Sequence, residues 1–185
     1  MIEAEHPVRI DVGIDQVWDY VRDIRKWAAV FPGCRACDVI SEHDSRWTLK
    51  VGAGGMVRTV NVQVHVDQWA GPEQVHFSYR LEGEPVVGSG SYLAARKGAD
   101  QTEVCLKVCV EGSGPMAPMW EAVSRPLLPQ LAKSFAGKLK ADIEQTAALP
   151  AAQGMVAAGR TSVLARIRAW LRKIGTALFG SKTQR

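Results

Sequence analysis

The chain has 185 residues, of which 46% are hydrophobic and 23% charged, with a formal net charge of +4. This length suits one domain with a sizeable core plus a short appendage. Four cysteines are too few for a disulfide scaffold, and the first residues lack the basic and apolar regions of a secretory signal. We therefore expect a cytoplasmic protein.

The charge is divided unevenly along the chain. All 19 acidic residues lie at or before Glu144, whereas seven of the 23 basic residues follow it. Residues 1–144 thus carry a net charge of −3, and residues 145–185 a net charge of +7. This asymmetry predicts a mildly acidic domain whose basic tail meets an anionic partner, such as a membrane surface.

The first part of the chain predicts a strand and two short helices. In residues 8–12 apolar and charged residues alternate, which predicts a short strand. Asp15 is expected to cap the helix that follows it. A second helical piece covers residues 25–30 and ends at Pro32 and Gly33, because proline and glycine together stop a helix.

Six strand-like runs come next. In the longest of them, valines at every second position alternate with polar residues, which predicts one buried and one solvated face. The predicted strands cover residues 36–42, 46–51, 56–69, 75–82, 86–95 and 104–111. Turn residues 112–115 then separate the last strand from a long helical pattern.

The long pattern extends from about residue 118 to residue 149. Its apolar residues recur every three or four positions, the spacing of one helix face. They are Trp120, Val123, Leu127, Leu131, Phe135, Leu139 and Ile143. Such a helix must lay its apolar face on the sheet, so we expect an α+β fold with a seven-stranded curved antiparallel sheet around a long helix.

Two glycines in the strand at residues 86–95 suggest a cavity under that helix. Gly88, Gly90 and Tyr92 stand at every second position of the strand, so they lie on the same face, which we assign to the inside of the sheet. Two missing side chains on that face would leave space. A β-bulge or a close approach of the helix would explain the same glycines equally well.

The order of elements resembles the START-like (SRPBCC) helix-grip superfamily, and more specifically the CoxG family, which is associated with carbon monoxide dehydrogenase. The resemblance covers roughly residues 3–146. It is carried by Val17-Trp18, Phe31-Pro32-Gly33-Cys34, Leu49-Lys50-Val51-Gly52-Ala53-Gly54, Gly88-Ser89-Gly90 and the long closing helix. It implies a cavity for a hydrophobic ligand, an isoprenoid quinone or a lipid, and association with a molybdenum-containing dehydrogenase at the membrane.

The alternation along the strands and the apolar faces of the helices identify the residues expected to line this cavity and bind the ligand. They are Trp27, Phe31, Val60, Val62, Phe77, Tyr79, Tyr92, Trp120, Val123, Leu127 and Leu131.

The sequence predicts no group of residues arranged for catalysis or for binding a metal ion. His65 and His76 fall on the polar faces of their strands, and no histidine pairs with an inward carboxylate or cysteine. Cys34 and Cys37 form a C-x-x-C, but no second pair at similar spacing completes a zinc site. We therefore predict no catalytic residues, no metal and no covalent cofactor.

The predicted domain organisation is a START-like domain over residues 1–148, a flexible linker over 149–161, a basic amphipathic helix over 162–179 and a disordered end over 180–185. The amphipathic helix combines an apolar stripe, a tryptophan and flanking basic residues, which is typical of helices that lie in the lipid headgroup layer. Its charges exclude a membrane-spanning helix. The expected membrane-binding residues are Val163, Leu164, Arg166, Ile167, Arg168, Trp170, Leu171, Arg172, Lys173, Ile174 and Leu178.

The favoured function is a non-catalytic carrier of a hydrophobic ligand that recruits or links a molybdenum hydroxylase, such as carbon monoxide dehydrogenase, to the inner face of the cell membrane. Two alternatives stay open: a recruitment or assembly factor without a ligand, and a START-like cyclase or hydrolase. The tail helix could also dock on the protein's own domain or in a partner's groove. Nucleic acid is not an expected partner, because its interfaces lack a broad apolar stripe.

Overall fold

The computed structural model describes the backbone of residues 1–53 and 56–178, and the side chains of residues 1–52 and 57–149. Contacts divide the chain into two compact units, Met1–Gln145 and Thr146–Arg185. The sheet and the cavity described below belong to the first unit.

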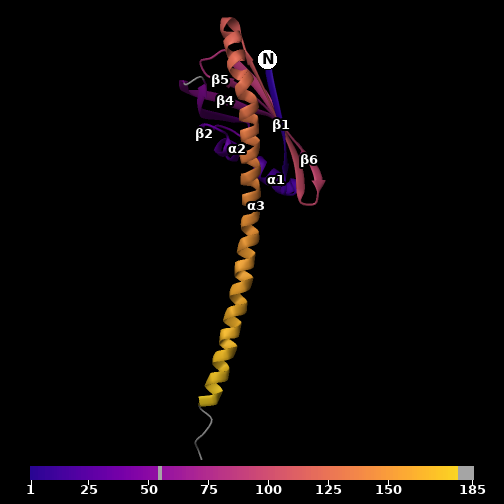
Figure 1. Ribbon diagram of the computed structural model, residues 1–185, viewed down its shortest axis with the longest axis vertical. Coiled ribbons are helices and arrows are strands. Elements are labelled where there is room, and N and C mark those ends of the chain that lie inside the picture. Colours follow the sequence, from indigo (N-terminus) through magenta and orange to yellow (C-terminus); the bar gives the residue numbers. More distant parts are fainter. Residues whose placement is uncertain (54–55, 179–185) are drawn as a thin grey trace, which may run out of the picture. The chain divides into compact units, whose positions relative to one another are not determined.

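The elements follow the predicted order. They are β1 (Ile2–Ile10), α1 (Ile14–Val21), α2 (Ile24–Val30), β2 (Cys34–Val39), β3 (Asp44–Ala53), β4 (Met56–Ala70), β5 (Gln74–Leu81), β6 (Val86–Gly98), β7 (Gln101–Gly112), a short 3-10 helix η1 (Gly114–Met116) and α3 (Ala117–Leu178). Figure 1 shows the early part of α3 running across the sheet, with α1 and α2 beside it.

The seven strands form one antiparallel sheet in the order β1-β7-β6-β5-β4-β3-β2. The predicted seven-stranded sheet with its long closing helix is therefore confirmed. The first strand lies beside the last, with Ile2 opposite Val110 and Ile10 opposite Thr102. β1 begins at Ile2 rather than at residue 8, because pairing with β7 extends a strand whose local pattern is weak.

The caps of the two short helices differ from the prediction. The residue that caps α1 is Gly13, with no side-chain hydrogen bond, while Asp15 lies within the first turn. There its carboxylate accepts a hydrogen bond from Arg96 at 3.1 Å, and an acidic group near a helix N-terminus is favourable. In α2, by contrast, the Asp23 side chain is a true cap, accepting from the Arg25 backbone N–H at 3.0 Å.

A short segment of α3 is packed tightly into the core. Ala136 and Leu139 are completely buried, and Ile143 is 2% exposed. Next to them, the Tyr20 hydroxyl donates a hydrogen bond to the Asp142 carboxylate at 2.5 Å, which joins α1 to α3. This segment therefore fixes α3 to the rest of the first unit.

The backbone of α3 stays helical through residues 149–161, where the sequence predicted a flexible linker. The composition explains this difference, since the segment is rich in alanine, the residue with the highest helix propensity. The tail helix expected over 162–179 is thus part of α3 as far as Leu178. The expected disordered end, 180–185, lies outside the described residues.

The two glycines of β6 do not leave empty space. Gly88 lies opposite Tyr79 and Gly90 opposite Phe77 on the neighbouring strand. A Cβ atom placed on either glycine would overlap the ring of its partner, and also a backbone carbonyl of β7. Aromatic rings of β5 therefore cover the glycines, and neither glycine lines the cavity.

We predict that Leu139→Ala lowers the free energy of unfolding by about 2–5 kcal/mol, because it leaves a cavity in a fully buried site. Urea denaturation followed by circular dichroism measures the change. The matched control is Lys138→Ala, one residue earlier and exposed, which should stay within about 0.5 kcal/mol of the wild type. Equal losses in the two variants would contradict the packing described for α3.

We also predict that Gly88→Ala destabilises the protein by about 1–3 kcal/mol, since the new methyl group must displace the Tyr79 ring or the β7 backbone. This cost exceeds the gain of about 0.4–1 kcal/mol that replacing glycine brings through the unfolded chain. Thermal unfolding checks the prediction. Gly98→Ala is the control on the same strand, because its Cβ would meet only the Gln101 Cβ at 3.9 Å.

Candidate functional site

A cavity of about 400 Å³ lies between the inner face of the sheet, α2 and the first part of α3. Strands β3 to β7 all contribute to its wall. Its volume falls in the range of about 300–1,000 Å³ that is typical of small-molecule sites. Two of the residues that line it, Met119 and Arg58, are 44% and 65% exposed, so the cavity reaches the surface beside them.

The structure brings together all of the predicted lining residues except Tyr92. Those that line the cavity are Trp27, Phe31, Val60, Val62, Phe77, Tyr79, Trp120, Val123, Leu127 and Leu131. Tyr92 does share their face, but it is completely buried, with its ring centroid 6.0 Å from that of Trp27. It packs behind the wall and does not line the cavity.

Sequence reasoning missed several lining residues that the same alternation could have identified. Val64 and Val66 continue the inward series of β4 beyond Val62. On β3, Trp47 and Leu49 also line the cavity; Trp47 lies opposite Val62, and Leu49 opposite Val60. Once the register of β3 against β4 is known, their inward orientation follows directly.

Aromatic rings close one end of the cavity. The Trp27 ring of α2 lies about 6 Å from the rings of Phe77 on the sheet and Phe135 on α3, at 6.1 and 6.0 Å. The Phe31 ring contacts Trp47 and Phe135 in the same way, at 5.5 and 5.4 Å. This aromatic cluster separates the closely packed part of the interface between α3 and the sheet from the cavity.

Most polar groups of the aromatic wall are already satisfied inside the protein. The indole N–H of Trp27 donates to the Val21 carbonyl at 2.6 Å, and that of Trp47 to the Ser45 hydroxyl at 3.0 Å. The Tyr79 hydroxyl donates to the Cys109 carbonyl at 2.7 Å, and burial raises the pKa of Tyr79, so the hydroxyl stays protonated.

Three buried polar atoms have no hydrogen-bond partner among the described residues: the Trp69 Nε1, the Tyr92 hydroxyl and the Trp120 Nε1. A buried donor left without a partner costs about 1–3 kcal/mol.

The lining offers little acid–base chemistry. Among the lining residues that the structure describes, there is no histidine, aspartate, glutamate or cysteine. His65 lies outside the cavity with its Nδ1 2.8 Å from the Asp44 carboxylate, and His43 Nδ1 lies 2.6 Å from the Val66 carbonyl. The described part of the chain contains no group of three or more His, Cys, Asp or Glu side chains that could hold a metal ion.

The C-x-x-C cysteines are not activated nucleophiles. Cys34 and Cys37 are free thiols on β2. Burial is the main cause that raises the pKa of both thiols, so they stay protonated at neutral pH and are poor nucleophiles and ligands.

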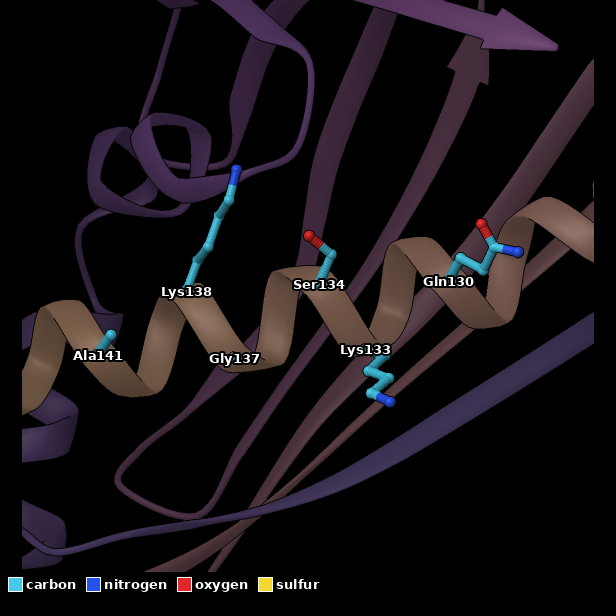
Figure 2. Close-up of a pocket in the computed structure, with 6 residues that line it drawn as sticks. All are labelled: Gln130, Lys133, Ser134, Gly137, Lys138 and Ala141. Carbon is cyan, nitrogen blue, oxygen red and sulfur yellow. The ribbon is translucent and has the colours of Figure 1, made fainter.

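A second hollow lies along the outer side of α3. Figure 2 shows its residues, Gln130, Lys133, Ser134, Gly137, Lys138 and Ala141, all on this one helix. Gln130, Ser134 and Lys138 extend to one side of the helix and Lys133 to the other. Without an opposing wall this hollow cannot enclose a ligand, so the cavity under α3 is the candidate site.

The predicted membrane-binding residues lie on the part of α3 whose side chains are not described. Their backbone is helical, and their binding to a membrane stays a prediction, from Val163 and Leu164 to Ile174 and Leu178. Within the described residues, no helix is both long and apolar enough to cross a membrane.

Comparisons with known proteins agree with this fold. The conserved protein from Geobacillus kaustophilus is 16% identical, with a TM-score of 0.68 over 78% of this chain and 97% of that chain. A START superfamily protein from Mycobacterium smegmatis is 15% identical, with a TM-score of 0.61 over 78% and 98%. The Zhui aromatase/cyclase from Streptomyces sp. R1128 is 18% identical, with a TM-score of 0.56 over 78% and 94%.

These identities are low, so the solved structures show the fold alone. No curated protein matches the chain. The model of one family matches residues 1–144, which include the whole sheet and the part of α3 that covers the cavity. On this match the chain belongs to the polyketide cyclase / dehydrase and lipid transport family, with the START-like fold.

Proposed function

We propose that this protein is a non-catalytic carrier of a hydrophobic ligand. The observation that carries the proposal is the cavity of about 400 Å³ under α3, whose wall is built mainly from Val, Leu, Phe and Trp side chains. An apolar molecule that fills the cavity would remove its own apolar surface and that of the cavity wall from water, which favours binding by about 25 cal/mol per Å² of apolar surface buried. Among the lining residues that the structure describes, there is no histidine, aspartate, glutamate or cysteine to act as a general acid or base.

A finer proposal concerns the kind of carrier. The motif Phe31-Pro32-Gly33-Cys34, which resembles the CoxG family, forms the turn from α2 into β2, and Phe31 reaches the cavity from it. This resemblance supports a quinone or lipid as ligand and a molybdenum-containing dehydrogenase, such as carbon monoxide dehydrogenase, as partner.

The third part of the proposal is a peripheral location on the inner face of the cell membrane. Its support is the net charge of +7 after Glu144, together with the helical backbone of α3 as far as Leu178. Each basic residue near an anionic leaflet contributes roughly 1 kcal/mol.

An aromatase/cyclase activity is the second candidate, because the Zhui protein has that name and the chain belongs to a family that includes cyclases. Cyclisation requires polar groups that hold and polarise a substrate. In this cavity, Tyr79 and the neighbouring indoles of α2 and β3 are engaged in hydrogen bonds within the protein. We therefore favour the carrier.

The test of the carrier function is mass spectrometry of an organic extract of the purified full-length protein, before and after incubation with membranes. We expect one apolar molecule in roughly stoichiometric amount. Val123→Trp should lower its uptake, because Val123 lines the cavity and the larger side chain would occupy part of the space that the ligand needs.

The matched control for this experiment is Ala122→Trp, one residue earlier on the exposed side of α3. It should take up the ligand like the wild type, and the melting temperatures of both variants verify that they fold. Equal ligand content in the Val123 variant and the wild type would show that the molecule binds elsewhere. An extract free of ligand after incubation would leave only the recruitment function.

For the tail, we predict that removing residues 150–185 abolishes co-sedimentation with vesicles that contain phosphatidylglycerol. Changing Arg166, Arg168, Arg172 and Lys173 to glutamate should weaken binding by several kcal/mol, from roughly 1 kcal/mol for each charge lost and more for its reversal. Vesicles of phosphatidylcholine alone are the control for charge dependence. Undiminished binding of the truncated protein would contradict a membrane-binding tail.

A further inference from the structure

The cavity under α3 is long and narrow. On α3 the lining residues run from Met119 to Phe135, and a helix that rises about 1.5 Å per residue spans about 24 Å between them. On β4 the lining residues run from Arg58 to Val66, which is about 26 Å of strand at about 3.3 Å per residue. Helix and strand belong to opposite walls, so two separate elements give a length of about 25 Å.

One end of this length is closed by aromatic rings. Val66 lies opposite Phe77 in the sheet, and the Trp27 ring contacts Phe77 at 6.1 Å and Phe135 at 6.0 Å between ring centroids. Val66 and Trp27 are each only 2% exposed. The last lining residues of β4 and of α3 therefore meet at the same closed end.

The other ends of the two walls also lie together. The Arg58 guanidinium is 3.1 Å from the Glu84 carboxylate. The next residue, Pro85, accepts a hydrogen bond from the Ser113 backbone N–H at 2.8 Å, shortly before α3 begins. Arg58 and Met119, both well exposed, therefore mark the mouth of the cavity, at the opposite end from the aromatic rings.

The length and the volume of the cavity match a single hydrocarbon chain. With a C–C bond of about 1.5 Å and an angle near 111°, an extended chain advances about 1.25 Å per carbon, so about 25 Å holds about 20 carbons. At the packing density of protein interiors a methylene group occupies about 23 Å³, so the volume of about 400 Å³ holds about 17 carbons. Two chains side by side would need about twice this volume.

A compact ligand would use this space less well. A fused ring system of the same volume is shorter than the cavity and would leave one end without contacts, with the loss of the dispersion energy there. A chain that runs from the closed end to the mouth contacts the wall along its whole length.

The mouth is the end that suits a polar head group. At the closed end, the indole N–H groups of Trp27 and Trp47 already donate to protein oxygens. Burying a polar group there without a hydrogen bond would cost about 1–3 kcal/mol. A head group at the mouth, beside Arg58 and Met119, stays in contact with water.

From these observations we infer that the cavity binds one linear hydrocarbon chain of about 16–20 carbons, with its terminal carbons against the aromatic end and its head group at the mouth. This inference rests on the proposed carrier function and names the class of its ligand, a single-chain amphiphile. Acyl chains of lipids and isoprenoid chains share this chemistry.

The experiment measures how chain length limits binding. The full-length protein is incubated with phosphatidylcholine vesicles that contain an equimolar series of straight-chain alcohols, from twelve to twenty-four carbons. The protein is then separated by gel filtration, and its bound alcohols are quantified by mass spectrometry. We expect the ratio of bound alcohol to alcohol in the vesicles to stay level up to about 18 carbons and then to fall about fourfold for each further methylene, because that methylene leaves the bilayer for water at the mouth.

Two further probes test the orientation and the source of the chain. Hexadecanediol, with a hydroxyl group at each end, should be bound at least about fivefold less than hexadecanol, because its second hydroxyl would be buried at the closed end. Geranylgeraniol has the same backbone length as hexadecanol and four additional methyl branches. Preference for hexadecanol identifies an acyl chain as the ligand, and preference for geranylgeraniol an isoprenoid chain.

A variant at the closed end should move the length limit. Val66→Ala removes two methyl groups from this end, so the fall should begin at chains about two carbons longer. The matched control is His65→Ala, the preceding residue, whose side chain is 53% exposed on the other face of β4. It should leave the profile as in the wild type, and melting temperatures verify that both variants fold.

Three results would overturn the inference. A ratio that stays level through twenty-four carbons would mean that no closed end limits the chain, and equal binding of hexadecanediol and hexadecanol would mean that the chain end is not buried. Phosphatidylcholine bound in place of the alcohols would show a cavity wide enough for two chains. Failure of the carrier function has a different signature, because the wild type would then retain none of these molecules.

Discussion

The burial of Ala136, Leu139 and Ile143 is the interaction on which the rest of the first unit depends. At this segment α3 lies directly on the core, and the Tyr20–Asp142 hydrogen bond attaches it to α1. Towards its N-terminus, the same face of the helix becomes the roof of a cavity. One helix therefore provides both the close packing that stabilises the fold and the hollow that can accept a ligand, along successive turns of a single apolar stripe.

The local pattern of the sequence accounts for much of this architecture. Alternation on β4 and β5 and the helical period of α3 place Val60, Phe77 and Leu127 on the cavity side, and the structure agrees. Periodicity identifies a face, but it cannot show what covers that face. Gly88 is covered by a ring from the adjacent strand, and Tyr92 lies behind Trp27, because both outcomes depend on pairing between distant segments.

The polar groups of the cavity wall are arranged so that few of them remain available. Where Trp27, Trp47 and Tyr79 point polar atoms into the wall, an oxygen of the protein accepts each hydrogen bond. The wall is then apolar in effect although several of its residues are amphipathic.

The pairing of β1 with β7 has a consequence for how the chain folds during synthesis. Ile2 must find Val110, so the first strand leaves the ribosome long before its partner exists. Contacts between segments so far apart in sequence are slow to form, because the entropy of closing the loop is lost before the sheet is complete. The sheet can close only after β7 emerges, and the cavity gains its roof later still, when α3 docks. Until then the apolar inner face is exposed to water, and transiently exposed apolar surface of this kind is prone to aggregation.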